Sequence, residues 1–142
     1  ERFEREYNLL IELPGVSAIV ACVILSEIGP NVEAFKSQGN LASWAGVCPG
    51  SYESAGIKKS SHTTQGNKYL KSILFQAGGT AGRSKDEAFH NLYARISGRS
   101  SKMKAIIACA HKMIRVIYKI LSTGEHYDAK KALGLRQQAR AN

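Results

Sequence analysis

The chain has 142 residues and a mass of 15.5 kDa, which fits one domain with a real core and leaves no room for a second. Hydrophobic residues make up 44% of it, a share that excludes a globally disordered chain. The formal net charge of +9 and the pI near 9.6 favour a polyanionic partner, nucleic acid before an anionic membrane. A basic face that is merely solvated stays open as the alternative.

The chain begins with a pair of helical patterns joined by a sharp turn. Apolar residues at helical spacing predict helices over 1–11 and 16–28, and the L-P-G-V run between them predicts a reversal, because Pro cannot continue a helix interior. Residues 7–29 therefore resemble a helix-hairpin-helix element, in which backbone N–H groups near Gly15 and Ser17 would hold a nucleic-acid phosphate. Such elements usually carry a second Gly where this chain has Ser17. An ordinary αα-hairpin that packs into a core is an equally open interpretation.

Further helical patterns occupy most of the remaining chain. Since no segment alternates strongly with period two, except for a short stretch in the central segment, we predict an all-α fold. Trp44 is expected in the core, and Gly98 is expected to end the helix before it. The predicted helices cover 32–35, 38–45, 67–81, 85–96 and 101–122.

The helix over 101–122 has the clearest apolar stripe of the chain. The stripe begins at Met103 and ends at Leu121, and it is assigned to the core, whereas Lys112 is placed on the solvent side. The polar, basic residues 129–142 that follow are expected to form a frayed tail unless a partner orders them. Residues 1–128 are expected to form the domain itself.

The segment from Gly46 to Leu70 separates two helical patterns and is rich in glycine, serine, threonine and lysine. Loops of this length inside a compact domain are usually functional or disordered, and the helices on both sides favour a functional one. Lysines and a predicted helix start near Gly66 would together bind an anion, because the amino end of a helix carries partial positive charge. The residues assigned to phosphate binding are Lys58, Lys59, Gly66, Asn67, Lys68 and Lys71.

The charges beyond this segment also favour a nucleic acid. Between Ser54 and Gly124 there are thirteen Lys and Arg residues and only two acidic ones, Asp86 and Glu87. The acidic residues of the whole chain are scattered, so we predict no metal site and no cofactor in it. A serine in a cationic loop can attack phosphorus, but spacing alone does not choose among the five hydroxyl residues Ser51, Ser54, Ser60, Ser61 and Thr63. The alternative is that they are turn residues bonded to local backbone.

The cysteines and the apolar runs bear on the cellular compartment. Three cysteines, Cys22, Cys48 and Cys109, are odd in number and far apart, and no C-x-x-C pair suggests zinc. Reduced thiols and a cytoplasmic location are therefore expected. No apolar run approaches a membrane span, and the charged start is no signal peptide, so no membrane partner is expected.

The run A-G-V-C-P-G-S-Y-E-S-A-G, followed by lysines and G-N-K-Y-L-K, resembles the signature of the C-terminal domain of bridge-RNA-guided insertion-sequence transposases, the DEDD family related to the pilin-gene invertase. The L-P-G-V turn and the G-x-x-Y at 124–127 also fit that family, and the resemblance covers Leu9 to Asp128. The basic stretch is diluted by hydroxyl residues in this chain. The residues that match the signature are Ala45, Gly46, Pro49, Ser54, Ala55, Gly56, Gly66, Asn67 and Leu70, with Lys71 replacing the usual Arg.

The resemblance implies that Ser54 is the nucleophile that joins covalently to a DNA phosphate during strand exchange. It also implies DNA and a guide RNA as partners, a homo-oligomer, and Mg²⁺ held by four acidic residues in an N-terminal RNase H-like domain that this sequence does not contain. We therefore expect a piece of a longer transposase that is inactive alone. The rival interpretations are a non-catalytic helix-hairpin-helix nucleic-acid-binding module and a protein-interaction domain.

Overall fold

The computed structural model describes residues 3–29, 35, 38–47 and 68–133, and within these ranges the chain forms helices and connections without strands. The all-α prediction is therefore confirmed. The helices are α1 (Glu4–Leu10), α2 (Ala18–Ile28), α3 (Gln38–Ala45), α4 (Lys68–Gly82), α5 (Glu87–Arg99) and α6 (Lys102–Thr123).

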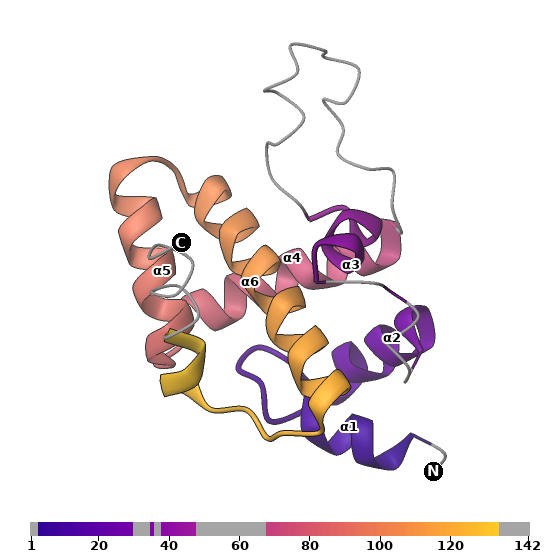
Figure 1. Cartoon of the computed structure of the whole chain (residues 1–142). Coiled ribbons are helices and arrows are strands. Elements are labelled where there is room, and N and C mark those ends of the chain that lie inside the picture. Colours follow the sequence, from indigo (N-terminus) through magenta and orange to yellow (C-terminus); the bar gives the residue numbers. More distant parts are fainter. Residues whose placement is uncertain (1–2, 30–34, 36–37, 48–67, 134–142) are drawn as a thin grey trace.

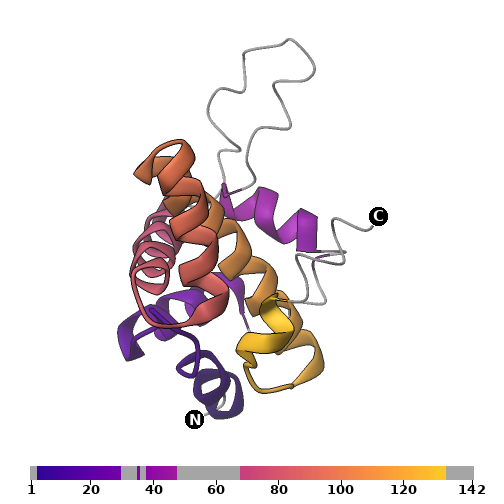
Figure 2. The same cartoon turned by 90° about the vertical axis from the view of Figure 1, so that its left-hand side faces the viewer.

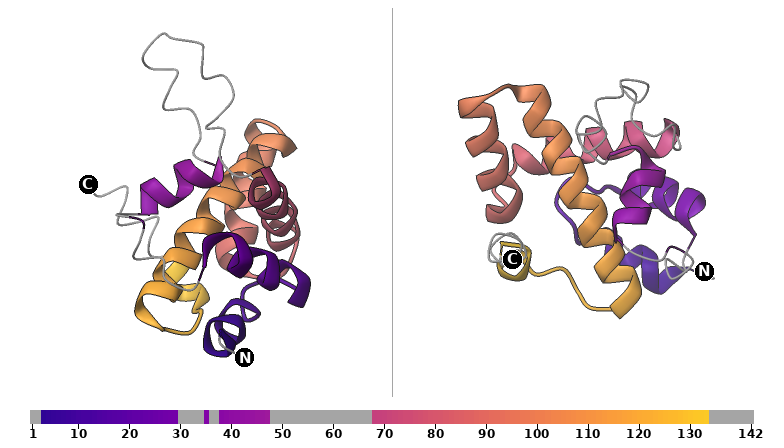
Figure 3. Two further views of the ribbon diagram at one scale, coloured as in Figure 1. Left: turned by 90° about the vertical axis from the view of Figure 1, so that its right-hand side faces the viewer. Right: turned by 45° about the horizontal axis from the view of Figure 1, so that its top comes forward.

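Helix α6 is the centre of the domain and contacts α1, α3, α4 and α5 (Figure 1). Helices α3 and α5 lie on opposite sides of it (Figures 2 and 3). The α1–α2 pair lies near the carboxyl end of α6, and the α5–α6 turn lies at the other end (Figure 1). Every helix contributes to one core, whose fully buried members include Leu10, Ile24, Leu41, Leu74, Phe89 and Ile117.

Local signals in the sequence account for the observed helix ends. The hydroxyl of Ser101 accepts a hydrogen bond from the Lys104 N–H and caps the start of α6, while Gly124 takes the left-handed conformation that ends it. Asp86 caps α5 in the same way, by accepting from the N–H groups of Ala88 and Phe89. These caps satisfy helix-end donors that would otherwise lack a partner.

Helix α5 is longer than predicted. It continues through Gly98 and ends at Arg99, with the Ser100 N–H bonded to the Ile96 carbonyl. A glycine in a helix costs only about 1 kcal/mol relative to alanine, so it does not terminate a helix that tertiary contacts hold.

The stripe on α6 differs from its prediction at two positions. Met103 is 57% exposed, because the α5–α6 turn stands at the margin of the bundle (Figure 1). Lys112, which was assigned to solvent, is buried, and its Nζ donates a 2.9 Å hydrogen bond to the Ala132 carbonyl oxygen. Residues 129–133 are helical and cover this lysine, so the beginning of the supposed frayed tail is in fact packed.

The prediction for Trp44 was wrong in part. Its side chain is 36% exposed, at the end of α3, and its ring lies 5.3 Å from the Phe35 ring with a tilt of 51°. Trp44 is thus packed in part and exposed in part, since α3 lies on the outside of α6.

Candidate nucleic-acid interface

The central segment leaves and rejoins the domain at two buried residues. Val47 is 1% exposed and its N–H donates to the Ala42 carbonyl oxygen (3.1 Å), while Leu70 is fully buried in the first turn of α4. Gly46, just before Val47, has a φ of +78°, a conformation that glycine adopts without strain. Both ends of the segment are therefore held by the core. Residues 48–67 lie outside the described ranges.

Five of the assigned site residues fall within 48–67, so their assignments stay predictions. They are Ser54, Lys58, Lys59, Gly66 and Asn67.

Lys68 and Lys71 form a cationic edge in the first turn of α4. Lys68 is exposed, and Lys71 is half-buried with its Nζ 5.8 Å from the centre of the Phe75 ring. Residues three apart on a helix lie on the same side, and α4 contains no acidic residue. The positive end of the helix dipole adds to the same field. This end of α4 thus favours an anion.

Gly15 packs against α4, and Ser17 caps the start of α2. A Cβ on Gly15 would collide with the Ala77 carbonyl oxygen, and its φ of +80° also favours glycine. Ser17 is exposed, and its hydroxyl accepts from the Val20 N–H (3.3 Å) to cap α2. Because Ala77 lies nine residues beyond Lys68, Gly15 is about 13 Å from the start of α4 along the helix axis. Gly15 thus packs on the far half of α4, away from Lys68.

The α5–α6 turn is a basic surface that the sequence analysis did not single out. All residues from 98 to 104 are exposed, and we call them the basic turn. None of the ion pairs among the described residues involves Arg99, Lys102 or Lys104. A signal for it exists in the sequence, since residues 88–124 contain seven Lys and Arg and no Asp or Glu. Exposed cations of this density suit a phosphate backbone.

The acidic residues that face the protein serve the fold. The Glu12 carboxylate accepts from the Tyr127 N–H (3.3 Å) and lies 2.7 Å from His126 Nδ1, which ties the α1–α2 turn to the segment after α6. Asp86 accepts from the Tyr127 hydroxyl at 2.8 and 3.0 Å and also caps α5. Within the described residues, no three His, Cys, Asp or Glu side chains gather in a way that could hold a metal ion.

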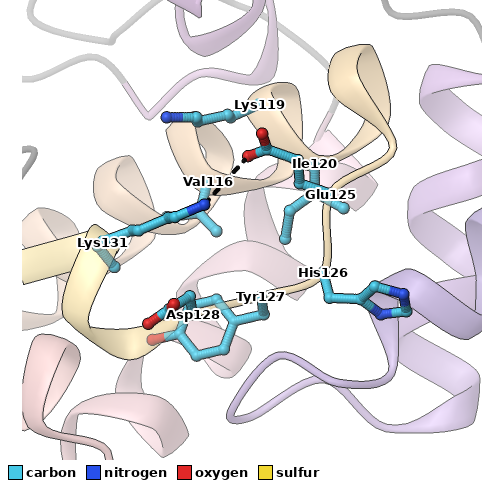
Figure 4. A pocket seen from close by; sticks show the side chains of 9 residues that line it. Val116, Lys119, Ile120, Glu125, His126, Tyr127, Asp128 and Lys131 are labelled. Carbon is cyan, nitrogen blue, oxygen red and sulfur yellow. Dashed lines mark ion pairs between the residues drawn. The ribbon is translucent and has the colours of Figure 1, made fainter.

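A small pocket lies between residues 125–128 and the carboxyl half of α6 (Figure 4). Its volume of about 30 Å³ has room for a water molecule but not for a nucleotide. Glu125 and Lys131 form an ion pair across it, with a separation of 3.9 Å. The pocket is a narrow gap between α6 and the residues that follow it.

Cys109 is a buried thiol whose reactivity is reduced by burial. Burial raises its pKa to about 11, although nearby Lys112 lowers it in part, and Sγ lies 3.7 Å from the Phe89 carbonyl oxygen. At a pH of about 8, we expect iodoacetamide to label Cys109 at least about tenfold more slowly than the exposed Cys22, because the thiolate is the reactive form. Mass spectrometry of the digested protein measures both rates. The difference should vanish in urea; equal rates in the native protein would contradict the burial of Cys109.

No helix in the described part of the chain has the length and apolar character that a membrane span requires.

The sequence profile of the family described as Transposase IS116/IS110/IS902 matches residues 7–94, which is more than half of the chain. The chain is 32% identical over 126 residues to the y4pF/y4sB protein of Sinorhizobium fredii, which is named as a transposase. The match covers 83% of this chain and 32% of that protein. It is 28% identical over 133 residues to the 43.6 kDa protein of insertion element IS110 from Streptomyces coelicolor. That match covers 92% of this chain and 32% of the Streptomyces protein.

The pilin gene-inverting protein of Moraxella bovis is 29% identical over 127 residues, with 87% of this chain and 39% of that protein covered. The chain thus spans about a third of the length of these curated relatives. No solved structure matches it. The profile match extends from the α1–α2 pair through the central segment into α5, and on that ground the chain belongs to the Transposase IS116/IS110/IS902 family.

Proposed function

We propose that this chain is the part of a DNA transposase that supplies a serine nucleophile for strand exchange, with Ser54 as that serine. The observation that carries the proposal is the family match over residues 7–94, which includes the whole central segment. The buried ends of that segment at Val47 and Leu70 support it, because a nucleophile must be positioned by a rigid scaffold. The cationic edge of α4 at Lys68 and Lys71 supports it further.

In the proposed step, the Ser54 Oγ attacks a DNA phosphorus atom. A bond forms between Oγ and phosphorus while one phosphorus–oxygen bond to a flanking sugar breaks. The serine proton passes to a base, and the departing sugar oxygen takes up a proton, so the linkage is exchanged without oxidation or reduction. Cations beside the phosphate stabilise the charge that develops on its oxygens. That role falls to Lys58, Lys59, Lys68 and Lys71.

The remaining parts of the reaction belong to the rest of a longer protein. Since the chain spans about a third of its relatives, we propose that the acidic Mg²⁺-binding residues lie outside it and are contributed by another protomer of a homo-oligomer. A guide RNA would be a further partner of that assembly. The described residues do not suit Mg²⁺, because Asp86 and Glu12 are already bonded to backbone N–H groups and side chains.

The test is the covalent adduct between protein and DNA. In the protein expressed at the full length of its reading frame, Ser54→Ala should abolish adducts with end-labelled DNA on a denaturing gel, because no other atom replaces Oγ. Binding measured by gel shift should change by less than about twofold, since the lysines remain. Ser51→Ala and Ser60→Ala are matched controls that should keep the adduct.

Adducts that persist in Ser54→Ala would remove the catalytic assignment and leave a non-catalytic nucleic-acid-binding module. Absence of DNA affinity at low salt in the unchanged protein would favour a protein-interaction domain instead.

A further inference from the structure

We propose that the first turn of α4 binds an unpaired nucleotide, with the Tyr69 ring stacked on the base and the Lys68 ammonium paired with the phosphate. This inference rests on the nucleic-acid binding of the proposed function and adds the kind of strand that is bound.

Tyr69 is the most exposed large apolar side chain among the described residues, at 75%. Helix α4 does not bring it into the core, because Leu70 and Leu74 occupy the inward positions and are fully buried. The ring therefore stands on a helix that the core holds in place. A rigid aromatic ring loses little conformational freedom when it binds, and its open face offers a large apolar area.

The charge around Tyr69 selects an anionic partner. Lys68 is the preceding residue and is exposed, and Lys71 follows within the same turn. No acidic residue lies anywhere on α4 to repel a phosphate. Adjacent helix positions diverge by about 100°, so the long lysine side chain can reach a phosphate while the ring faces the attached base.

The ring distinguishes an unpaired strand from a duplex. In a duplex the faces of each base are covered by the neighbouring base pairs, and only phosphates and groove edges are accessible. In a single strand the bases are free to stack on aromatic side chains, which works for every base because each has a π-face. Strand exchange separates paired strands, so a site for an unpaired base suits the chemistry proposed for Ser54.

The experiment compares a short single-stranded oligonucleotide with the blunt duplex of the same sequence, by fluorescence anisotropy on the 142-residue chain at low salt. Tyr69→Ala should weaken single-strand binding by about 5- to 150-fold, the range for loss of one stacked base. Duplex binding should change by less than about twofold. Tyr69→Phe should keep the preference for the single strand, because it keeps the ring.

Two further variants separate stacking from charge. Ile19→Ala removes a side chain on α2 that is 74% exposed, and it should leave both affinities unchanged. Lys68→Gln should reduce the salt dependence of single-strand binding by about 0.7 in the slope of log K against log salt. Tyr69→Ala should leave that slope as it is, since it removes no charge.

Equal losses on both DNAs, or no loss on either, would overturn the inference while leaving phosphate binding and the Ser54 proposal in place. A dimer of the unchanged chain that dissociates in Tyr69→Ala, seen by analytical ultracentrifugation, would also overturn it by assigning the ring to self-association. If the unchanged chain binds neither DNA at low salt, the inference and the DNA-binding part of the proposed function both fail.

Discussion

Gly78→Ala is expected to destabilise the domain by about 1–3 kcal/mol and to lower its unfolding temperature by about 4–12 °C. Gly78 is buried where α4 crosses α6. A Cβ there would lie 2.7 Å from the Ala110 nitrogen and 3.0 Å from the Ala110 Cα and the Cys109 carbonyl carbon. All three are backbone atoms, so no rotamer change relieves the clash and the two helices must move apart.

Gly98→Ala is the matched control for this substitution. Gly98 lies inside α5, and nothing lies within 4 Å of the position that its Cβ would take. The same replacement should therefore stabilise the protein by about 0.5–1 kcal/mol, because alanine loses less backbone entropy in a helix than glycine. Thermal unfolding followed by circular dichroism measures both. A Gly78→Ala protein as stable as the unchanged one would contradict the close crossing of α4 and α6.

Tyr127→Phe is expected to reduce stability by about 1.5–3 kcal/mol at neutral pH, the range for a hydrogen bond to a charged group. Its hydroxyl donates to both oxygens of the Asp86 carboxylate, and that carboxylate caps α5. The link holds the segment after α6 against the start of α5. Urea unfolding at pH about 7 measures the loss. Tyr69→Phe is the control, since it removes a hydroxyl from an exposed ring and should change stability by less than about 0.5 kcal/mol.

The same variant carries a pH signature. Burial, followed by the hydrogen bond to Asp86 and its negative charge, raises the pKa of Tyr127 above its ordinary value of 10.0. The unfolded chain thus ionises first, and this part of the stability is present below pH 10 and is lost as the pH rises further. Tyr127→Phe should lose less stability than the unchanged protein between a pH of about 8 and about 10.5. If both proteins lost the same stability over this pH range, ionisation of Tyr127 would not contribute to the pH dependence of folding.

Much of the helical architecture was predictable because its causes are local. The apolar stripe of α6 predicted its bounds to within one residue at each end, and the 38–45 prediction coincides with α3. The start of α5 was missed by two residues, although Asp86 followed by Glu87 is a capping signal that the sequence contains. The charge excess pointed toward nucleic acid, and family membership agrees with that direction.

The candidate site was harder to predict from the sequence, because which of its residues are packed and which are exposed depends on contacts that form only in the tertiary structure. Lys68 and Lys71 could be placed at a helix start by local pattern alone. Spacing could not show that the predicted phosphate contact at Gly15 packs on the far half of α4. The basic turn was not distinguished by a general count of positive charges, because its capacity to bind an anion depends on its exposure and on its having no ion pair among the described residues.

By itself the sequence determined an all-helical basic domain of a transposase family, since periodicity, caps and motif order act over a few residues along the chain. Only the tertiary structure decided which side chains the helices bury against one another. In the tertiary structure Lys112 is buried beneath residues 129–133, and Tyr69 is exposed to solvent. Helices α4 and α6 approach closely at Gly78, because glycine has no side chain. Burial and exposure depend on the neighbour that covers a residue, and that neighbour lies elsewhere in the chain.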